Sequence, residues 1–225
     1  MQDEKNTAYY DYANPYVLQI MPPAVGTVLE IGCGAGRLGE TYKERYPNSR
    51  YVGVELNTQA AALAAGRLDK VLSGSAEDIK LDFLAGEVDC LVYADVLEHL
   101  TDPWQMLKDH AALLSDGGKV VASIPNVQNW SILKDLIFGL WNYTDEGLMD
   151  RTHLRFFTLD GIGQLFARAG LSIEGISVVN IPHQQPEMTQ FVEQLRPALT
   201  NFGIDAETFS ERVSAFQYLV LARRA

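Results

Sequence analysis

One stretch of this 225-residue chain decides its fold: Val28-Leu29-Glu30-Ile31-Gly32-Cys33-Gly34-Ala35-Gly36. A short apolar run that ends in glycines predicts a buried strand and then a tight turn, because glycine lets the backbone bend sharply and approach a ligand closely. The spacing is G-x-G-x-G, whereas a dinucleotide fingerprint would place its third glycine at Arg37. The carboxylate of Glu30 would repel a pyrophosphate. The stretch therefore predicts a nucleotide-type turn that suits a positively charged ligand.

Short β-rich runs alternate with longer helical runs after this turn. The expected strands are 27–31, 51–55, 70–72, 88–93 and 119–124, and the expected helices are 38–46, 58–68 and 104–114. Such alternation predicts an α/β fold, a parallel sheet with helices on both faces. The last third is expected to add helices at 159–169 and 191–199 and strands at 171–179 and 217–222. We expect one domain over residues 1–225, with an antiparallel addition at the sheet edge and a cap formed by about residues 1–22 and 127–155.

The composition is that of a folded chain with an excess of acidic residues. Hydrophobic residues make up 47% and charged residues 21%, so a core can form. The net charge of −11 argues against a nucleic-acid partner, because binding a phosphate backbone needs a cationic surface. Two cysteines cannot form a disulfide framework, the first residues lack a secretory leader, and no apolar run approaches the ~20 residues that span a bilayer. We therefore expect a cytoplasmic protein with no membrane span.

Polar residues also follow the second and third expected strands. Glu55 ends the second strand, where a carboxylate can accept hydrogen bonds from both hydroxyls of a ribose. Gly74-Ser75-Ala76-Glu77-Asp78 follows the third strand and suits backbone contacts to an adenine edge, with a plain acidic turn as the alternative.

A second polar group follows the fourth expected strand. Asp95, Glu98 and His99 lie three and four residues apart, so on a helical turn they would face one side. A later stretch, Asp150 to Thr158, brings a second histidine, His153. Carboxylates and imidazoles that meet in this way fit either a divalent metal or a general base. Histidines that only pack on the sheet are the alternative.

Aromatic residues are concentrated in the two segments of the expected cap. Trp130, Trp141 and Tyr143 suit stacking on a sugar ring, or else a hydrophobic lid. Asn126 suits a hydrogen bond to a ligand, or else a turn. Four tyrosines near the N-terminus either fold over the ligand or belong to the core: Tyr9, Tyr10, Tyr12 and Tyr16.

Taken together, these motifs resemble the class I S-adenosylmethionine-dependent methyltransferases over nearly the whole chain. The motifs are residues 28–36, Val52-Gly53-Val54-Glu55, Ala76-Glu77-Asp78, Asp89-Cys90-Leu91-Val92-Tyr93-Ala94-Asp95 and Leu113-Leu114-Ser115-Asp116-Gly117-Gly118. The resemblance implies a seven-stranded, doubly wound Rossmann-like sheet that is mostly parallel with an antiparallel last strand. It also implies S-adenosyl-L-methionine as cofactor, S-adenosyl-L-homocysteine as product, and methyl transfer from a sulfonium to a nucleophile.

The resemblance assigns residues to both ends of this reaction. The methionine part of the cofactor would contact Glu30, Gly32, Gly34 and Gly36, and the ribose would contact Glu55. The other expected cofactor contacts are Cys33, Leu56, Ser75, Ala76, Glu77 and Ala94. The expected catalytic residues on the acceptor side are Asp95, His99 and His153.

Three branches of the family resemble the acceptor side of this chain. Glu98-His99 resembles the pair in ubiquinone-biosynthesis O-methyltransferases. With His153 it also resembles the metal site of small-RNA 3′-terminal 2′-O-methyltransferases. Asp95 is one methylene shorter than the glutamate of those metal-binding relatives, so we expect no metal and no sensitivity to a chelator. The stretch 150–158 resembles methyltransferases of bacterial polysaccharide pathways.

The sequence therefore predicts an O- or N-methyltransferase that acts on a small-molecule or glycan acceptor. The alternatives are a metal-assisted 2′-O-methyltransferase of RNA ends, a nicotinamide-dependent oxidoreductase, and a non-catalytic subunit that keeps the fold. The glycine spacing argues against the oxidoreductase. Oligomeric state has no signal in the sequence.

Overall fold

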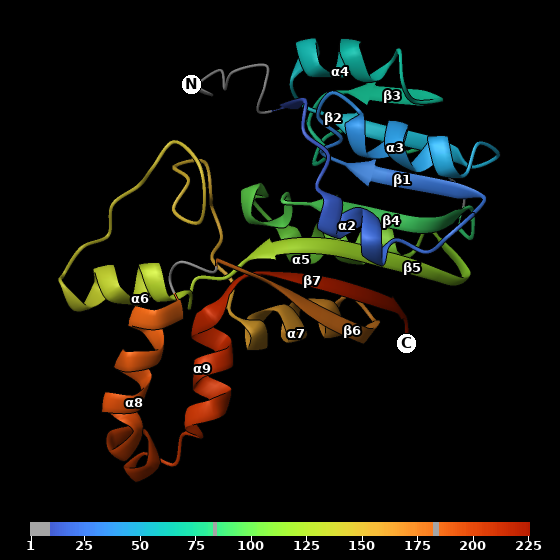
Figure 1. Cartoon of the computed structure of the whole chain (residues 1–225). Helices are drawn as coiled ribbons and strands as arrows, with labels where there is room; N and C mark the ends of the chain where they lie inside the picture. The colour runs from blue at the N-terminus through green and yellow to red at the C-terminus, as the bar shows by residue number, and fades with distance from the viewer. Residues whose placement is uncertain (1–9, 83–84, 182–184) are drawn as a thin grey trace.

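Seven strands form one sheet at the centre of the computed structural model, which describes residues 10–82, 85–181 and 185–225 (Figure 1). The strands are β1 (Thr27–Ile31), β2 (Arg50–Glu55), β3 (Lys70–Ser73), β4 (Val88–Ala94), β5 (Leu114–Pro125), β6 (Leu171–Asn180) and β7 (Ala215–Arg224). Their order is β3-β2-β1-β4-β5-β7-β6. Neighbours among β1 to β5 pair in parallel, whereas β7 runs antiparallel to β5 and β6. The predicted Rossmann-like sheet with an antiparallel last strand is confirmed.

Helices connect the strands and extend beyond the predicted set. They are α2 (Pro15–Ile20), α3 (Arg37–Arg45), α4 (Thr58–Ala64), η1 (Leu97–His99), α5 (Pro103–Ala111), α6 (Trp130–Ile137), α7 (Leu159–Arg168), α8 (Gln185–Asn201) and α9 (Ala206–Ser214). The expected helices do not include α2, α6 or α9, although α2 and α9 carry a start signal. Asn14 caps α2 ahead of a proline, and Asp205 caps α9.

Helices cover both faces of the sheet, because successive residues of a strand point to opposite sides. Leu29 and Ile31 of β1 lie in the core that α5 and α7 cover. Val28 lies in the core that α2 and α3 cover, on the opposite face (Figure 1). Because β1 to β5 pair in parallel, their carboxyl ends meet at one edge of the sheet, where folds of this type bind ligands.

The helices α8 and α9 form a hairpin between β6 and β7, set apart from the sheet (Figure 1). Helix α6 packs on this hairpin: the rings of Trp130 and Phe191 lie 4.6 Å apart and share a small core with Met188 and Val213. The predicted cap joined residues 127–155 to the N-terminal residues 1–22. The structure shows that α6 from this segment packs on the hairpin, which the predicted cap did not include.

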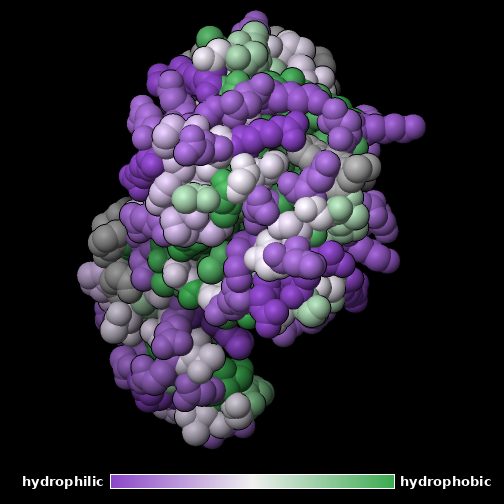
Figure 2. Space-filling view, turned by 90° about the vertical axis from the view of Figure 1, so that its right-hand side faces the viewer, coloured by the Kyte–Doolittle hydropathy of each residue, from purple (hydrophilic) through white to green (hydrophobic). Residues whose placement is uncertain are grey.

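The opposite edge of the sheet, where the parallel strands begin, is mostly hydrophilic with smaller hydrophobic patches (Figure 2). The hairpin of α8 and α9 projects at the bottom of this view. Among the described residues, no helix has the length and apolar character needed to cross a membrane.

Candidate active site

The glycine turn between β1 and α3 has the backbone geometry that the sequence predicted. Gly32, Gly34 and Gly36 have φ angles of 71°, 53° and 81°, in the left-handed region that side chains disfavour. A Cβ atom at Gly34 would lie 2.6 Å from the carbonyl oxygen of Tyr10. This position therefore requires glycine for its space as well as for its conformation.

Each N–H group of this turn already donates to an acceptor inside the protein. The N–H groups of Gly32 and Cys33 donate to the carbonyl oxygen of Val54 at 2.8 and 3.0 Å. The N–H of Gly34 donates to Glu55 Oε2 at 2.8 Å. The N–H of Ala35 donates to the carbonyl oxygen of Tyr10 at 2.8 Å, and the N–H of Gly36 donates to that of Cys33 at 2.9 Å. A pyrophosphate is bound by free N–H groups at the start of such a helix. None of these five groups is left for that purpose, so the turn fits a ligand that needs no phosphate site.

Glu55 ends β2 beside the turn, with its side chain nearly buried. Its Oε2 accepts from the N–H of Gly34 at 2.8 Å, and its Oε1 accepts from the N–H of Asn57 at 2.7 Å. Burial raises the pKa of Glu55, and these backbone hydrogen bonds oppose that shift. A carboxylate has about four acceptor positions, so each oxygen keeps capacity for a further hydrogen bond. The geometry fits two ribose hydroxyls.

Glu30 lies beneath the turn, where only 2% of the residue is exposed. Its Oε2 accepts a hydrogen bond from the hydroxyl of Tyr51 at 3.0 Å. Burial raises the pKa of Glu30 to about 8; the bond from Tyr51 opposes this shift and the nearby Glu55 carboxylate adds to it. At neutral pH this shift favours the neutral form of Glu30. Its contact with the cofactor remains a prediction.

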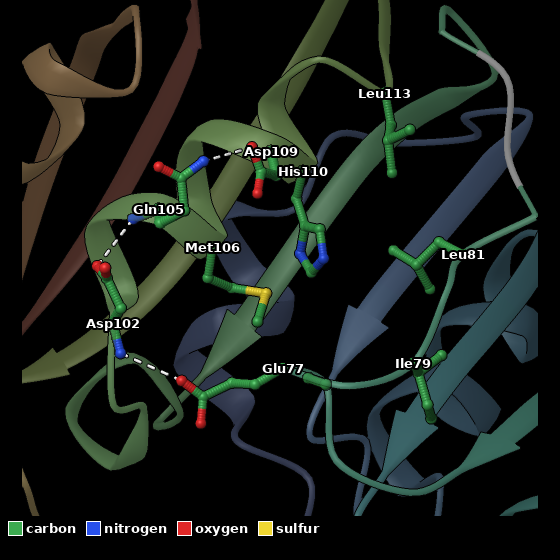
Figure 3. Close-up of a pocket in the computed structure, with 10 residues that line it drawn as sticks. Glu77, Ile79, Leu81, Asp102, Gln105, Met106, Asp109, His110 and Leu113 are labelled. Atoms are coloured by element: carbon green, nitrogen blue, oxygen red, sulfur yellow. Dashed lines mark hydrogen bonds between the residues drawn. The ribbon is translucent and has the colours of Figure 1, made fainter.

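The segment after β3 borders a cavity of about 390 Å³ that runs along α5 (Figure 3). Glu77 Oε1 accepts from the N–H groups of Thr101 and Asp102 at 2.9 and 3.1 Å, which ties this segment to the start of α5. The cavity is lined by Ala76, Glu77, Ile79, Leu81, Asp102, Gln105, Met106, Asp109, His110 and Leu113. Two of the expected adenine contacts, Ala76 and Glu77, therefore lie at a partly apolar cavity.

The remaining predicted cofactor contacts lie on the same edge of the sheet. Leu56 follows β2 and is 48% exposed, and Ala94 ends β4. The hydroxyl of Ser75 accepts a hydrogen bond from the N–H of Glu77 at 3.2 Å. Cys33 is buried, and burial raises the pKa of its thiol far above the usual value, which leaves it a neutral packing residue.

Asp95 follows β4 in a left-handed backbone conformation, with φ at 57°, which residues other than glycine rarely adopt. Its Oδ1 accepts from Ser123 Oγ at 2.8 Å and from Gln217 Nε2 at 2.7 Å. Its Oδ2 accepts from Asn14 Nδ2 at 3.2 Å. Burial raises the pKa of Asp95, while the bonds from Ser123 and Asn14 oppose the shift. Three neutral donors thus fix the carboxylate between β5, β7 and the N-terminal segment.

Glu98, His99 and His153 form a separate cluster beyond β4. One potential ligand atom from each lies within 4.8 Å of the others. The two imidazole rings are 4.7 Å apart, and Nε2 of His153 lies 4.0 Å from Oε1 of Glu98. The sequence grouped Asp95 with these residues. Its carboxylate is held by hydrogen bonds from Ser123, Gln217 and Asn14 and is not among the three grouped ligand atoms, but it lies near enough to interact electrostatically with Glu98 and His99.

Hydrogen bonds set the direction of both imidazoles. Nδ1 of His99 lies 3.2 Å from the carbonyl oxygen of Thr152 and 3.1 Å from its hydroxyl. Nδ1 of His153 lies 3.2 Å from the carbonyl oxygen of Leu148. The second nitrogen of His153 therefore faces Glu98. Such outer contacts fix the orientation of histidines that bind a metal or move a proton.

Glu98 has a buried carboxyl group without a hydrogen-bond partner. The residue is 1% exposed, and neither side-chain oxygen has a partner within the part of the chain that the structure describes. Burial, together with the carboxylates of Asp95 and Asp150, raises the pKa of Glu98 well above its usual value. An unsatisfied buried polar group costs ~1–3 kcal/mol and is rare in native proteins. This orphan carboxyl marks the cluster as a candidate site for a ligand or a proton.

Aromatic rings lead from the surface to the histidines. Trp141 and Tyr143 are 40% and 54% exposed, after the end of α6. The ring of Trp141 meets Phe156 edge-on at 5.4 Å, and Phe156 lies 6.3 Å from His153. Sugar rings stack on exposed aromatic faces of this kind.

The structure gives Asn126 a role within the fold and places one N-terminal tyrosine at the glycine turn. The amide of Asn126 is buried and donates to the carbonyl oxygens of Arg212 and Ala215 at 2.8 and 2.7 Å, so it joins α9 to β7. Tyr10 contacts the glycine turn through its carbonyl oxygen. Tyr9 lies outside the described residues.

Sequence reasoning missed the three residues that fix Asp95. Asn14 had a usable signal, since asparagine followed by proline is typical of a helix start. Ser123 and Gln217 lie in neighbouring strands, and period-two alternation identifies the face of a strand but not its partners across the sheet.

Comparison with known proteins identifies the family. A family model described as a methyltransferase domain matches residues 6–175. A ubiquinone biosynthesis O-methyltransferase from Pseudomonas aeruginosa (strain UCBPP-PA14) is 29% identical over 158 residues, 66% of each chain. The protein of that name from Xanthomonas axonopodis pv. citri is 30% identical over 118 residues, 49% of this chain and 48% of that one. The chain thus spans about half to two thirds of the length of these curated relatives.

Solved structures agree on the fold. A methyltransferase from Thermotoga maritima, described as a possible histamine N-methyltransferase, has a TM-score of 0.63 at 18% identity, covering 97% of this chain and 92% of that one. A methyltransferase from Mesorhizobium loti has a TM-score of 0.61 at 18% identity, covering 93% and 96%. The fold and the glycine turn define a class I methyltransferase. The chain belongs to the methyltransferase-domain family.

Proposed function

We propose that this enzyme methylates a hydroxyl or amine group of a small-molecule or glycan acceptor, and that the acceptor meets the cofactor between Asp95 and the histidine cluster. The observation that carries the proposal is the position of Glu98, His99 and His153. Glu98 and His99 follow β4, at the sheet edge that also carries the glycine turn and Glu55, and His153 joins them there from the segment between α6 and α7.

The residues at the cofactor end fit S-adenosylmethionine, which supplies an electrophilic methyl group on a sulfonium. Glu55 retains acceptor capacity for the ribose hydroxyls. Ala76 and Glu77 offer the cavity beside α5 to the adenine. The saturated N–H groups of the turn suit a ligand without phosphates.

At the acceptor end we assign a proton-transfer role to His99 or His153. A hydroxyl or amine must lose a proton as it gains the methyl group, and histidine is the side chain suited to accept it near neutral pH. The exposed rings of Trp141 and Tyr143 support a glycan or ring-containing acceptor. We further propose a single cytoplasmic domain, in keeping with the buried free thiols of Cys33 and Cys90.

Turnover on a panel of acceptors tests this function. The full chain is incubated with S-adenosylmethionine and, separately, with monosaccharide and disaccharide glycosides, phenols, aliphatic amines and a short RNA with a free 3′ end. Formation of S-adenosylhomocysteine and of a methylated product is followed by mass spectrometry. We expect products from glycoside, phenol or amine arms. Product from RNA alone would support the RNA alternative, and cofactor binding without turnover in any arm would support a non-catalytic role.

Metal-assisted transfer is a second candidate, favoured by the orphan carboxyl of Glu98. Two histidines and one glutamate form a common catalytic set for zinc. The sequence expectation of chelator insensitivity rested on Asp95, and the three-residue cluster does not use Asp95.

Thermal unfolding with and without added Zn²⁺, Mn²⁺ or Mg²⁺ separates the two candidates. A metal-bound site predicts a rise in melting temperature that EDTA reverses and that Glu98→Gln removes, with loss of turnover in EDTA. A base mechanism predicts neither effect. Glu174→Gln, at the far edge of the sheet, is the control for unspecific metal binding.

A further inference from the structure

Residues 10–14 form a segment, here called the strap, that joins the two ends of the proposed site. In Figure 1 it passes the ends of β2 and β1 on its way to α2. The carbonyl oxygen of Tyr10 accepts from the N–H of Ala35 at 2.8 Å and lies 2.6 Å from where a Cβ of Gly34 would be. The strap therefore lies directly on the glycine turn.

Ion pairs fasten this end of the strap. The carboxylate of Asp11 accepts from Arg37 Nε and Nη2 at 2.8 and 3.1 Å, and from Arg67 Nη1 at 2.7 Å. Arg67 also donates to the carbonyl oxygen of Ala35 at 2.6 Å, inside the turn. Since Arg37 begins α3 and Arg67 follows α4, one carboxylate ties the strap to both helices.

The other end of the strap is fixed by Asn14. Its Oδ1 accepts from the N–H groups of Tyr16 and Val17 at 3.1 and 3.3 Å, as the cap of α2. This orients the amide, so that Nδ2 donates to Asp95 Oδ2 at 3.2 Å. Between the two fixed ends lies Tyr12, which is 65% exposed. The strap thus spans from the cofactor turn to the acceptor-side carboxylate.

We propose that the strap retains the cofactor, and that Asp11 is a positioning residue which keeps the strap in place through Arg37 and Arg67. The proposal rests on the proposed cofactor site, because the strap packs on the turn of that site. The turn keeps its shape around a bound nucleoside only while the strap stays packed on it, so breaking the Asp11 ion pairs speeds release of the nucleoside. Asp11 need not touch the cofactor itself.

The test measures how fast tritiated S-adenosylhomocysteine leaves the full chain, after dilution into excess unlabelled ligand. Asp11→Asn removes the charge and should raise the dissociation rate about three- to tenfold, in line with partly exposed ion pairs. Asp11→Glu restores the charge and should return the rate toward that of the wild type. Glu174→Gln removes ion pairs to Lys119 and Arg223 at the far sheet edge and is the matched control.

Salt gives a second readout, which ties the release rate to the charge of Asp11. Raising sodium chloride should speed release from the wild type, because salt screens exposed ion pairs, and should change Asp11→Asn much less. An unchanged rate in Asp11→Asn, while Glu55→Ala weakens binding, would overturn the strap proposal alone. If neither variant alters binding, the proposed cofactor site itself is wrong.

Discussion

Polar groups at the cofactor end of the sheet satisfy one another, whereas at the acceptor end one of them does not. Around the glycine turn each N–H has an acceptor, and Glu30 and Glu55 both accept hydrogen bonds. Beyond β4, Glu98 is as deeply buried as Glu30, yet its carboxyl lacks any hydrogen-bond partner among the described residues.

This difference separates two kinds of effect. A satisfied site keeps its shape without a ligand, so changes there should alter affinity and stability. A site with an unsatisfied carboxyl carries an energetic cost that a ligand or proton can relieve. Changes at the acceptor end should therefore act mainly on turnover.

The largest expected effect is at the acceptor end. His153→Ala should lower turnover by ~10²–10⁴-fold, the range for loss of a general base, and leave S-adenosylhomocysteine affinity unchanged. Steady-state kinetics and calorimetry on the same preparation measure both. Glu174→Gln, at the far edge of the sheet and outside both ends of the proposed site, is the control. Full activity in His153→Ala would reduce this histidine to a packing role.

Glu30→Gln tests the cofactor end through pH. The folded-state pKa of about 8 lies above the ordinary 4.5, so stability from the neutral form is complete below pH 4.5 and is lost as pH rises through 8. Glu30→Gln should not lose this stability. As the pH rises from 4.5 to 8, its free energy of unfolding should therefore increase by ~2–4 kcal/mol relative to that of the wild type. Urea unfolding at several pH values measures the difference. Parallel curves for the two proteins would show that Glu30 is charged when folded.

Glu55→Ala sharpens the contrast between affinity and turnover. Loss of charge-assisted hydrogen bonds to ribose should weaken S-adenosylhomocysteine binding by ~10- to 100-fold. The melting temperature should also fall, because the N–H groups of Gly34 and Asn57 lose their acceptor. Asp69→Ala is the matched control: it removes an acceptor from the N–H of Tyr51, away from the turn. Equal affinities in wild type and Glu55→Ala would place the ribose elsewhere.

The smallest expected effect has the opposite sign. Glu98→Met replaces an orphan buried carboxyl by an apolar side chain of similar size. In EDTA it should stabilise the protein by ~1–2 kcal/mol while turnover is lost. Urea unfolding in EDTA measures the change. A destabilised variant would mean that Glu98 has a partner in solution.

The cofactor end could be predicted from the sequence because its contacts are local or follow strand pairing. Three glycines within five residues specify the turn, and parallel pairing of β1 with β2 brings Glu55 beside it. The raised pKa of Glu30 could not be predicted, since it depends on how deeply the fold buries this carboxyl group.

The acceptor end was predicted only in part, because distant segments build it. The adjacent carboxylate and imidazole of Glu98-His99 indicated a site. His153 joins them because its neighbour Thr152 contacts His99, 53 residues away in sequence. The orientation of the Asp95 carboxylate depends in part on Gln217, 122 residues away. No local pattern reports a partner at that distance.

Calorimetric titration of the wild type with S-adenosylhomocysteine and, separately, with nicotinamide adenine dinucleotide tests the central claim most directly. The claim is that the turn at residues 32–36, with its N–H groups saturated, accepts a sulfonium nucleoside and not a pyrophosphate. We predict micromolar binding of S-adenosylhomocysteine and no heat of binding with the dinucleotide. Tight binding of the dinucleotide would contradict the account.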